Sequence, residues 1–146
     1  MKRIAWVLLL LLSGCVASGP IFVAAGAPSS DQALIYVYRI NDQFGQMVPT
    51  QIIINGDEIA KLPNNAYTFA HVPAGAFKLF ATRFMDFNYS EKRRVVVEAL
   101  VSGGETYFFK VRTVAGPMAI VTHVSVEQPE QGNKDLQTLH LSALSK

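Results

Sequence analysis

The chain has 146 residues, of which half are hydrophobic and 16% are charged, and its formal net charge is +2. Lys2 and Arg3 precede the first apolar run, and without them eleven basic residues balance the eleven acidic ones. A neutral chain of this length predicts one domain and argues against nucleic acid as a partner, which requires a basic surface.

The N-terminal residues have the composition of an export signal. Lys2 and Arg3 are followed by nine consecutive apolar residues, 4–12, a length typical of the apolar core of a signal peptide. At about 1.5 Å per residue this run covers less than half of a hydrocarbon layer about 30 Å thick, so it is too short for a transmembrane helix. We therefore expect residues 1–14 to be a signal peptide.

The end of this signal, Leu12-Ser13-Gly14-Cys15, resembles the lipobox of bacterial lipoproteins, in which small residues precede a cysteine that becomes the lipidated N-terminus. The resemblance implies cleavage between Gly14 and Cys15 and a covalent lipid on Cys15, and we expect no other cofactor. A buried thiol is the plainer interpretation, but Cys15 has no second cysteine to pair with in an oxidising compartment. Val16 stands where an aspartate tends to retain such lipoproteins in the inner membrane. We therefore expect an anchor in the outer membrane, with the domain facing the periplasm.

The segment 15–30 contains glycine, proline and serine and shows neither strand alternation nor a helical stripe. We expect it to be a lipidated tether that lies near the lipid headgroups or packs on the domain. A single folded domain over 31–146 is expected to follow.

Eight segments rich in β-branched and aromatic residues predict strands. They are 33–39, 48–54, 58–62, 66–72, 77–84, 94–100, 106–112 and 119–126. We expect an all-β fold, an antiparallel β-sandwich of about seven to eight strands. Within 106–112, Tyr107, Phe109 and Val111 alternate with polar residues, Phe108 excepted, which predicts one face toward the core and one largely toward water.

Asn55-Gly56, between two apolar runs, is the strongest hairpin signal. A type I′ turn there would pair Ile54 with Asp57 and Ile52 with Ile59. Two further turn signals lie at 72–75 and 102–105.

Two interpretations stay open for the C-terminal residues. Leu136, Leu139, Ala143 and Leu144 recur at helical spacing, which favours a short helix over an open end of the sheet. The alternative is one more edge strand at 138–141.

The sequence has no motif with the spacing of a catalytic or metal site. His71, His123 and His140 lie far apart, without the neighbouring ligands that metal sites use. We expect no metal and no enzymatic activity.

The most informative candidate for binding is an aromatic cluster after the segment 77–84. Phe84, Phe87 and Tyr89 precede Lys92 in a short basic run. If exposed, these rings would contact a protein or stack on sugars, whereas the plainer interpretation makes them core at one end of the sandwich.

The chain resembles a family of bacterial lipoproteins grouped as domain of unknown function 2846, and six segments carry this resemblance in the same order. They are 35–39, 54–56, 60–62, Tyr67, 72–75 and 104–111. The chain also loosely resembles PEGA-type envelope modules. Both resemblances imply an antiparallel β-sandwich, and neither implies an activity.

Two functions therefore stay open. The first is a non-catalytic module, held at the membrane by its lipid, that binds an envelope protein through an exposed edge strand or the 84–89 segment. The second is a binder of a glycan or small apolar ligand in the mouth between the sheets, near Arg83 and Lys92.

Overall fold

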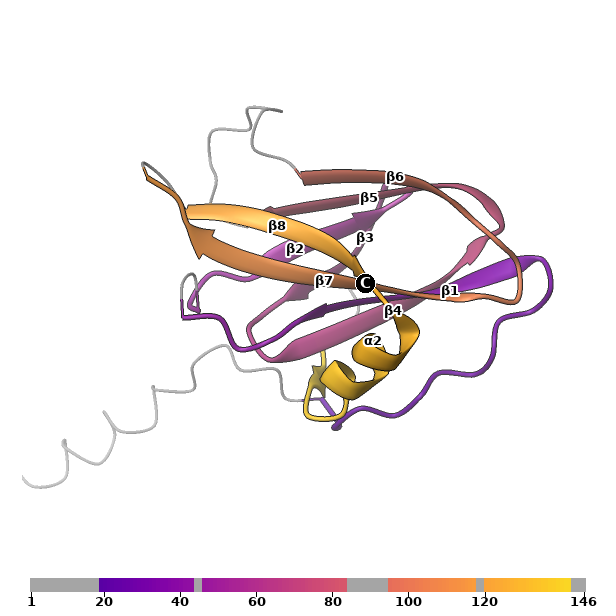
Figure 1. The fold of residues 1–146 in the computed structure, drawn as a ribbon, viewed down its shortest axis with the longest axis horizontal. Helices are drawn as coiled ribbons and strands as arrows, with labels where there is room; N and C mark the ends of the chain where they lie inside the picture. Colours follow the sequence, from indigo (N-terminus) through magenta and orange to yellow (C-terminus); the bar gives the residue numbers. More distant parts are fainter. Residues whose placement is uncertain (1–18, 44–45, 84–94, 118–119, 143–146) are drawn as a thin grey trace, which may run out of the picture.

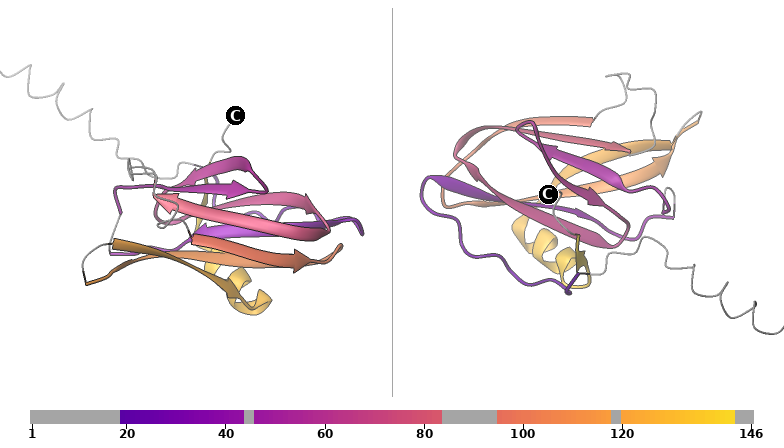
Figure 2. Two further views of the ribbon diagram at one scale, coloured as in Figure 1. Left: turned by 90° about the horizontal axis from the view of Figure 1, so that it is seen from above. Right: turned by 180° about the vertical axis from the view of Figure 1, so that it is seen from behind.

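The computed structural model describes residues 19–43, 46–83, 95–117 and 120–142. The strands are β1 (Gln32–Arg39), β2 (Thr50–Ile54), β3 (Asp57–Leu62), β4 (Ala66–Pro73), β5 (Gly75–Arg83), β6 (Val95–Val101), β7 (Thr106–Ala115), β8 (Ile120–Glu127) and β9 (His140–Leu141), and the helix is α2 (Pro129–Leu136). One sheet has the order β8-β7-β1-β4-β9 and the other the order β3-β2-β5-β6. The two sheets form separate layers, and α2 lies on the outside of the five-stranded one (Figures 1 and 2).

The β-sandwich predicted from the sequence is confirmed, and each of the eight predicted segments contains a strand. Two pairings differ from a purely antiparallel pattern, because β1 pairs with β7 and β4 pairs with β9 in parallel. The parallel pairing of β1 with β7 results from the turns at 72–75 and 102–105. Each carries the chain from one sheet to the other, so β7 arrives beside β1 from the opposite layer instead of folding back on β6.

The β2–β3 hairpin turns at Asn55-Gly56, as predicted. Both residues have positive φ, 51° and 100°, as a type I′ turn requires. The pairing beside the turn is also as predicted, but the next one is wrong, since Ile52 lies opposite Ala60 and not Ile59. A β-bulge in the hairpin shifts the register by one residue at this point.

Apolar side chains from both sheets fill the space between them. They include Ile35, Val37, Ile52, Leu62, Leu79 and Val111, all fully buried, and the ring pair Phe77–Phe109 with centroids 5.2 Å apart. Because half of the chain is hydrophobic and no disulfide is available, this packing and the backbone ladders hold the sandwich together.

A second apolar cluster lies on the outer face of the five-stranded sheet. Leu34, Tyr36, Tyr38 and Phe108 are buried there together with Leu136 and Leu139. Phe108, the exception to the predicted alternation of the segment 106–112, is buried because α2 covers it. Gly132 permits this close approach, since a Cβ at that position would lie 2.4 Å from Cγ of Phe108.

The C-terminal region contains both a helix and an edge strand, the two alternatives that the sequence left open. The helix lies earlier in the chain than predicted, and the strand is shorter. The helix ends at Leu136, where the predicted helical spacing begins, and Pro129 is set in its first turn, where a missing N–H costs nothing. Residues 140–141 then form the short edge strand β9. In the described part of the chain, no helix combines the length and the apolar character needed to cross a membrane.

Asp135 fastens α2 to the sheet. Its Oδ2 accepts hydrogen bonds from Tyr38 Oη at 2.9 Å and from Lys110 Nζ at 2.8 Å, and its Oδ1 accepts one from Gln131 Nε2 at 2.6 Å. Burial raises the pKa of Asp135, but the hydrogen bonds from Lys110, Tyr38 and Gln131 outweigh it and hold the pKa below its ordinary value of 3.8. Burial and the bond to Asp135 raise the pKa of Tyr38, which keeps this hydroxyl a donor.

Replacing Asp135 by asparagine is expected to lower the free energy of unfolding by about 1.5–3 kcal/mol at neutral pH, the usual worth of hydrogen bonds to a charged group. A carboxylate whose pKa is lowered by folding stabilises the protein above the pKa of the unfolded chain, about 3.9, and loses this effect as the pH falls through the folded value. The gap between wild type and Asp135→Asn should therefore shrink between pH 7 and pH 3 in urea titrations.

The matched control is Glu130→Gln, an exposed carboxylate on the same helix, with an expected change within about 0.5 kcal/mol. An equal gap for Asp135→Asn at both pH values would contradict the assigned role of its charge.

Candidate functional site

The strands at the sheet edges differ in how well they are protected. An edge strand presents unpaired N–H and C=O groups, which proteins guard with charges, short length or covering segments. β3 carries three charged residues among its six, and β9 has two residues and is bridged by Ile21. β8 carries Glu127 at its end.

β6 is the most apolar of the described edge strands. Six of its seven residues, VVVEALV, are apolar, and Glu98 is its single charged residue. It contains neither proline nor glycine. A segment of this kind has a strong tendency to pair with another strand.

The outer face of the four-stranded sheet continues this apolar character. Leu100 is 82% exposed and Val96 is 44% exposed. Val96 lies opposite Phe80 on β5, and Phe80 lies opposite Ile53 on β2, so an apolar row crosses three strands.

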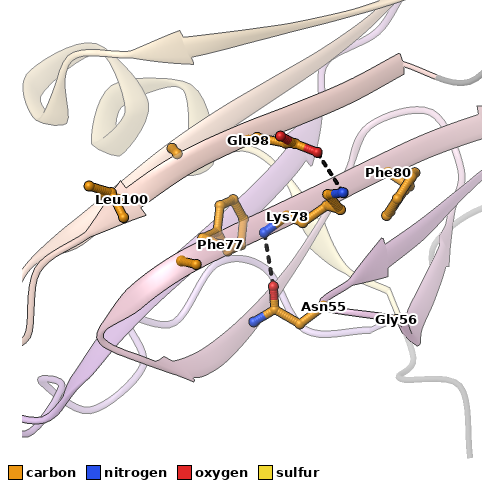
Figure 3. A pocket seen from close by; sticks show the side chains of 9 residues that line it. Asn55, Gly56, Phe77, Lys78, Phe80, Glu98 and Leu100 are labelled. Atoms are coloured by element: carbon orange, nitrogen blue, oxygen red, sulfur yellow. Dashed lines mark hydrogen bonds and ion pairs between the residues drawn. The ribbon is translucent and has the colours of Figure 1, made fainter.

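An open hollow of about 760 Å³ lies on this face, between the β2–β3 turn and β6 (Figure 3). Asn55, Lys78, Phe80, Glu98 and Leu100 line it, with backbone and small side chains between them. Residues of β6 line it, so the hollow lies beside the edge at which a further strand could pair.

The polar groups of the hollow neutralise one another. Lys78 Nζ lies 2.5 Å from Glu98 Oε1 and 5.7 Å from the centre of the Phe80 ring. The Lys78 backbone N donates to Asn55 Oδ1 at 2.9 Å, which ties the turn to β5. The lining of the hollow is thus mostly apolar, its ion pair carries no net charge, and a hydrogen bond holds the turn against β5.

The structure does not test the binding residues predicted from the sequence. Phe84, Phe87, Tyr89 and Lys92 lie outside the described residues, as do Gly14 and Cys15. The sequence singled out none of the residues that line the hollow for binding, and named Asn55 and Gly56 only as a turn. The apolar run of β6 with its single acid was the available signal.

The described residues contain no group of three or more histidine, cysteine or acidic side chains placed to hold a metal ion. His71 and His140 contact the N-terminal segment, with His71 Nε2 3.2 Å from the Gly26 carbonyl O and His140 Nδ1 3.0 Å from the Gly19 carbonyl O.

These features define the chain as a two-sheet β-sandwich domain with a poorly protected edge strand and an apolar hollow beside it. Residues 29–125 match the family model described as "Protein of unknown function (DUF2846)", which spans well over half of the sequence. The chain belongs to this family, as its strand and turn segments predicted. No curated protein and no solved structure matches it.

Proposed function

We propose that this protein is a lipid-anchored, non-catalytic module of the bacterial cell envelope that binds a partner protein by strand addition to β6. The observation that carries the proposal is the edge itself, seven residues long with one charge, and that charge paired with Lys78. A partner strand would satisfy the backbone groups of the edge and cover its apolar side chains.

The side chains around the edge indicate what the partner strand carries. Successive side chains of an added strand point to opposite faces, so every second one would lie over the outer face of the four-stranded sheet. There it would meet Leu100, Val96 and the Phe80 ring, which favours apolar side chains. The partner is therefore an extended segment with apolar residues at alternate positions.

The anchor supports an encounter with proteins of the same membrane. The lipobox-like segment that ends at Cys15 and the absence of aspartate at position 16 favour the outer membrane, with the domain in the periplasm. Holding the domain at a membrane raises the effective concentration of any partner anchored there.

The test is site-specific photo-crosslinking in living cells with the full-length protein. A crosslinker at Leu100 is expected to give a discrete protein adduct. The matched control is a crosslinker at Asp57, an exposed residue on β3 at the opposite edge of the same sheet, where no such adduct is expected. Val96→Lys, which adds a second charge to the edge, should remove most of the Leu100 adduct. The same adducts from Leu100 and Asp57, or an adduct indifferent to Val96→Lys, would contradict strand addition.

A ligand-binding role is the second candidate, and the hollow is the observation that favours it. Its volume of about 760 Å³ lies within the usual range of ligand pockets, about 300–1,000 Å³. Phe80 offers a ring for stacking, and Lys78 with Glu98 offers polar groups at its centre. Cell-wall glycan fragments or short-chain lipids that raise the melting temperature, together with no protein adduct at Leu100, would favour this role over strand addition.

A further inference from the structure

Residues 19–28, named the strap here, lie along the five-stranded sheet. The strap begins by pairing with β9, since Phe22 N donates to the Leu139 carbonyl at 3.0 Å and Leu141 N donates to the Pro20 carbonyl at 2.9 Å. The strap is therefore joined to the edge of the sheet next to β9.

The strap then crosses the outer face of the sheet, where two tyrosines bind it. Val23 N donates to Tyr67 Oη at 3.3 Å, and Ala25 N donates to Tyr36 Oη at 2.8 Å. The Phe22 ring packs edge-on against Tyr36 and Tyr67, with centroids 5.7 and 5.2 Å away. These contacts give the strap one defined position and determine which of its side chains face outward.

Two large apolar side chains of the strap face solvent. Ile21 is 58% exposed and Val23 is 66% exposed, on either side of the inward-facing Phe22. The strap carries no charged residue, and neither do Ser29 and Ser30 after it. Its outer side therefore offers apolar contact with no charge to desolvate.

The length of chain before the strap indicates what lies against this outer side. Three residues separate Gly19 from Cys15, and four links of extended chain span at most about 14 Å. A lipid on Cys15 would hold that residue at the membrane surface, so Gly19 cannot lie farther than this from the headgroups. Ile21 and Val23 follow shortly after and, among the described residues, are the exposed large apolar side chains closest in sequence to the anchor.

We infer that the strap docks the domain on the lipid bilayer itself, with Ile21 and Val23 inserted among the headgroups. This inference rests on the proposed lipid anchor at Cys15. The five-stranded sheet and α2 would then face the membrane, and the outer face of the four-stranded sheet, two layers away, would face the periplasm (Figure 2). The docked orientation leaves β6 and the hollow open to a partner.

The test uses a tryptophan placed on each face. The sequence has one tryptophan, Trp6, within the expected signal peptide, and Trp6→Phe removes it from every variant. Val23→Trp then reports on the strap, and Leu100→Trp is the matched control, an exposed apolar position on the opposite face. The full-length lipoprotein is purified from membranes and reconstituted in phosphatidylcholine vesicles whose acyl chains carry bromine, which quenches tryptophan fluorescence on contact.

The expected result is at least about threefold stronger quenching of Val23→Trp than of Leu100→Trp, with emission at a shorter wavelength, because tryptophan settles at the membrane interface. Equal quenching at the two positions would overturn the inference. A shorter emission wavelength at position 23 without quenching would also overturn it, because a protein and not lipid would then cover the strap.

Flotation of the vesicles separates this inference from the proposed anchor. Protein that floats with the vesicles but shows no preferential quenching at position 23 leaves the anchor intact and refutes docking. Protein that does not float at all refutes the anchor, and the docked orientation with it.

Discussion

A Cys15→Ser variant, exported with a signal peptide that is cleaved without lipidation, is expected to leave the membrane fraction almost completely. A single acyl chain binds a bilayer only marginally, whereas two or more chains hold a protein stably, and the serine variant would carry none. Ile21 and Val23 offer too little apolar area to replace a lipid anchor. We expect wild-type protein in the membrane pellet with labelled palmitate on the N-terminal peptide, and at least about a tenfold loss of both in the variant.

Val16→Asp is the matched control for this experiment, because it changes the neighbouring residue and keeps the cysteine. It is expected to stay membrane-bound and to move from the outer toward the inner membrane in a density gradient. A Cys15→Ser protein that remains in the pellet after washing with urea would place the anchor elsewhere in the chain, and the proposed function would fail at its first step.

The strands were predictable because their signals are local. Runs of β-branched and aromatic residues end at Asn55-Gly56 and at the turns 72–75 and 102–105, and the structure has a strand on each side of each turn. Which strands become neighbours was not predictable in the same way. The parallel pairing of β1 with β7 joins segments about seventy residues apart, and no local pattern encodes it.

The outer cluster shows how tertiary contacts override a local pattern. Phe108 broke the alternation of its strand because that face is covered, and the covering helix has a sequence, PEQGNKDL, with a single large apolar residue at its end. Its position depends on Gly132 against Phe108 and on the bonds of Asp135 to Tyr38 and Lys110. These are long-range contacts, so the helix could not be located from its own periodicity.

The candidate site was missed for a similar reason. Aromatic residues drew attention to the segment 84–89, which lies outside the described residues, and the exposed side chains of β6 were not singled out. The composition of 95–101 was visible in the sequence, but its importance depends on β6 being the last strand of its sheet. Strand order, not composition, decides whether such a run is core or edge.

A buried pair of opposite charges at one end of the sandwich was also not anticipated. Arg39 is fully buried, and its Nη1 donates to the Val48 carbonyl at 3.0 Å. Burial lowers the pKa of Arg39, the charge of Asp42 raises it, and Arg83 lowers it again. The negative charge of Asp42 thus partly offsets the effect of burial on the pKa of Arg39.

Asp42 also holds the end of β7. Its Oδ2 accepts a hydrogen bond from Thr113 N at 2.8 Å, and its Oδ1 lies 3.6 Å from Arg112 Nε. Asp42 itself is buried, whereas Arg112 is exposed, so the contact with Arg112 contributes less than the buried ones. Losing the carboxylate would remove a negative charge that stabilises the buried guanidinium and leave the Thr113 N–H without its acceptor.

Asp42→Ala is therefore expected to lower the free energy of unfolding by at least about 1–3 kcal/mol, the cost of leaving the buried Thr113 N–H without its acceptor, with a further loss because the charge of Asp42 no longer stabilises Arg39. Asp42→Asn keeps an oxygen that can accept from Thr113 N but removes the charge, so it should cost less. Urea titrations of the two variants and the wild type separate the hydrogen bond from the charge. If Asp42→Asn were as stable as the wild type, the hydrogen bond to Thr113 would account for the effect, and the charge of Asp42 would have no role in keeping Arg39 buried.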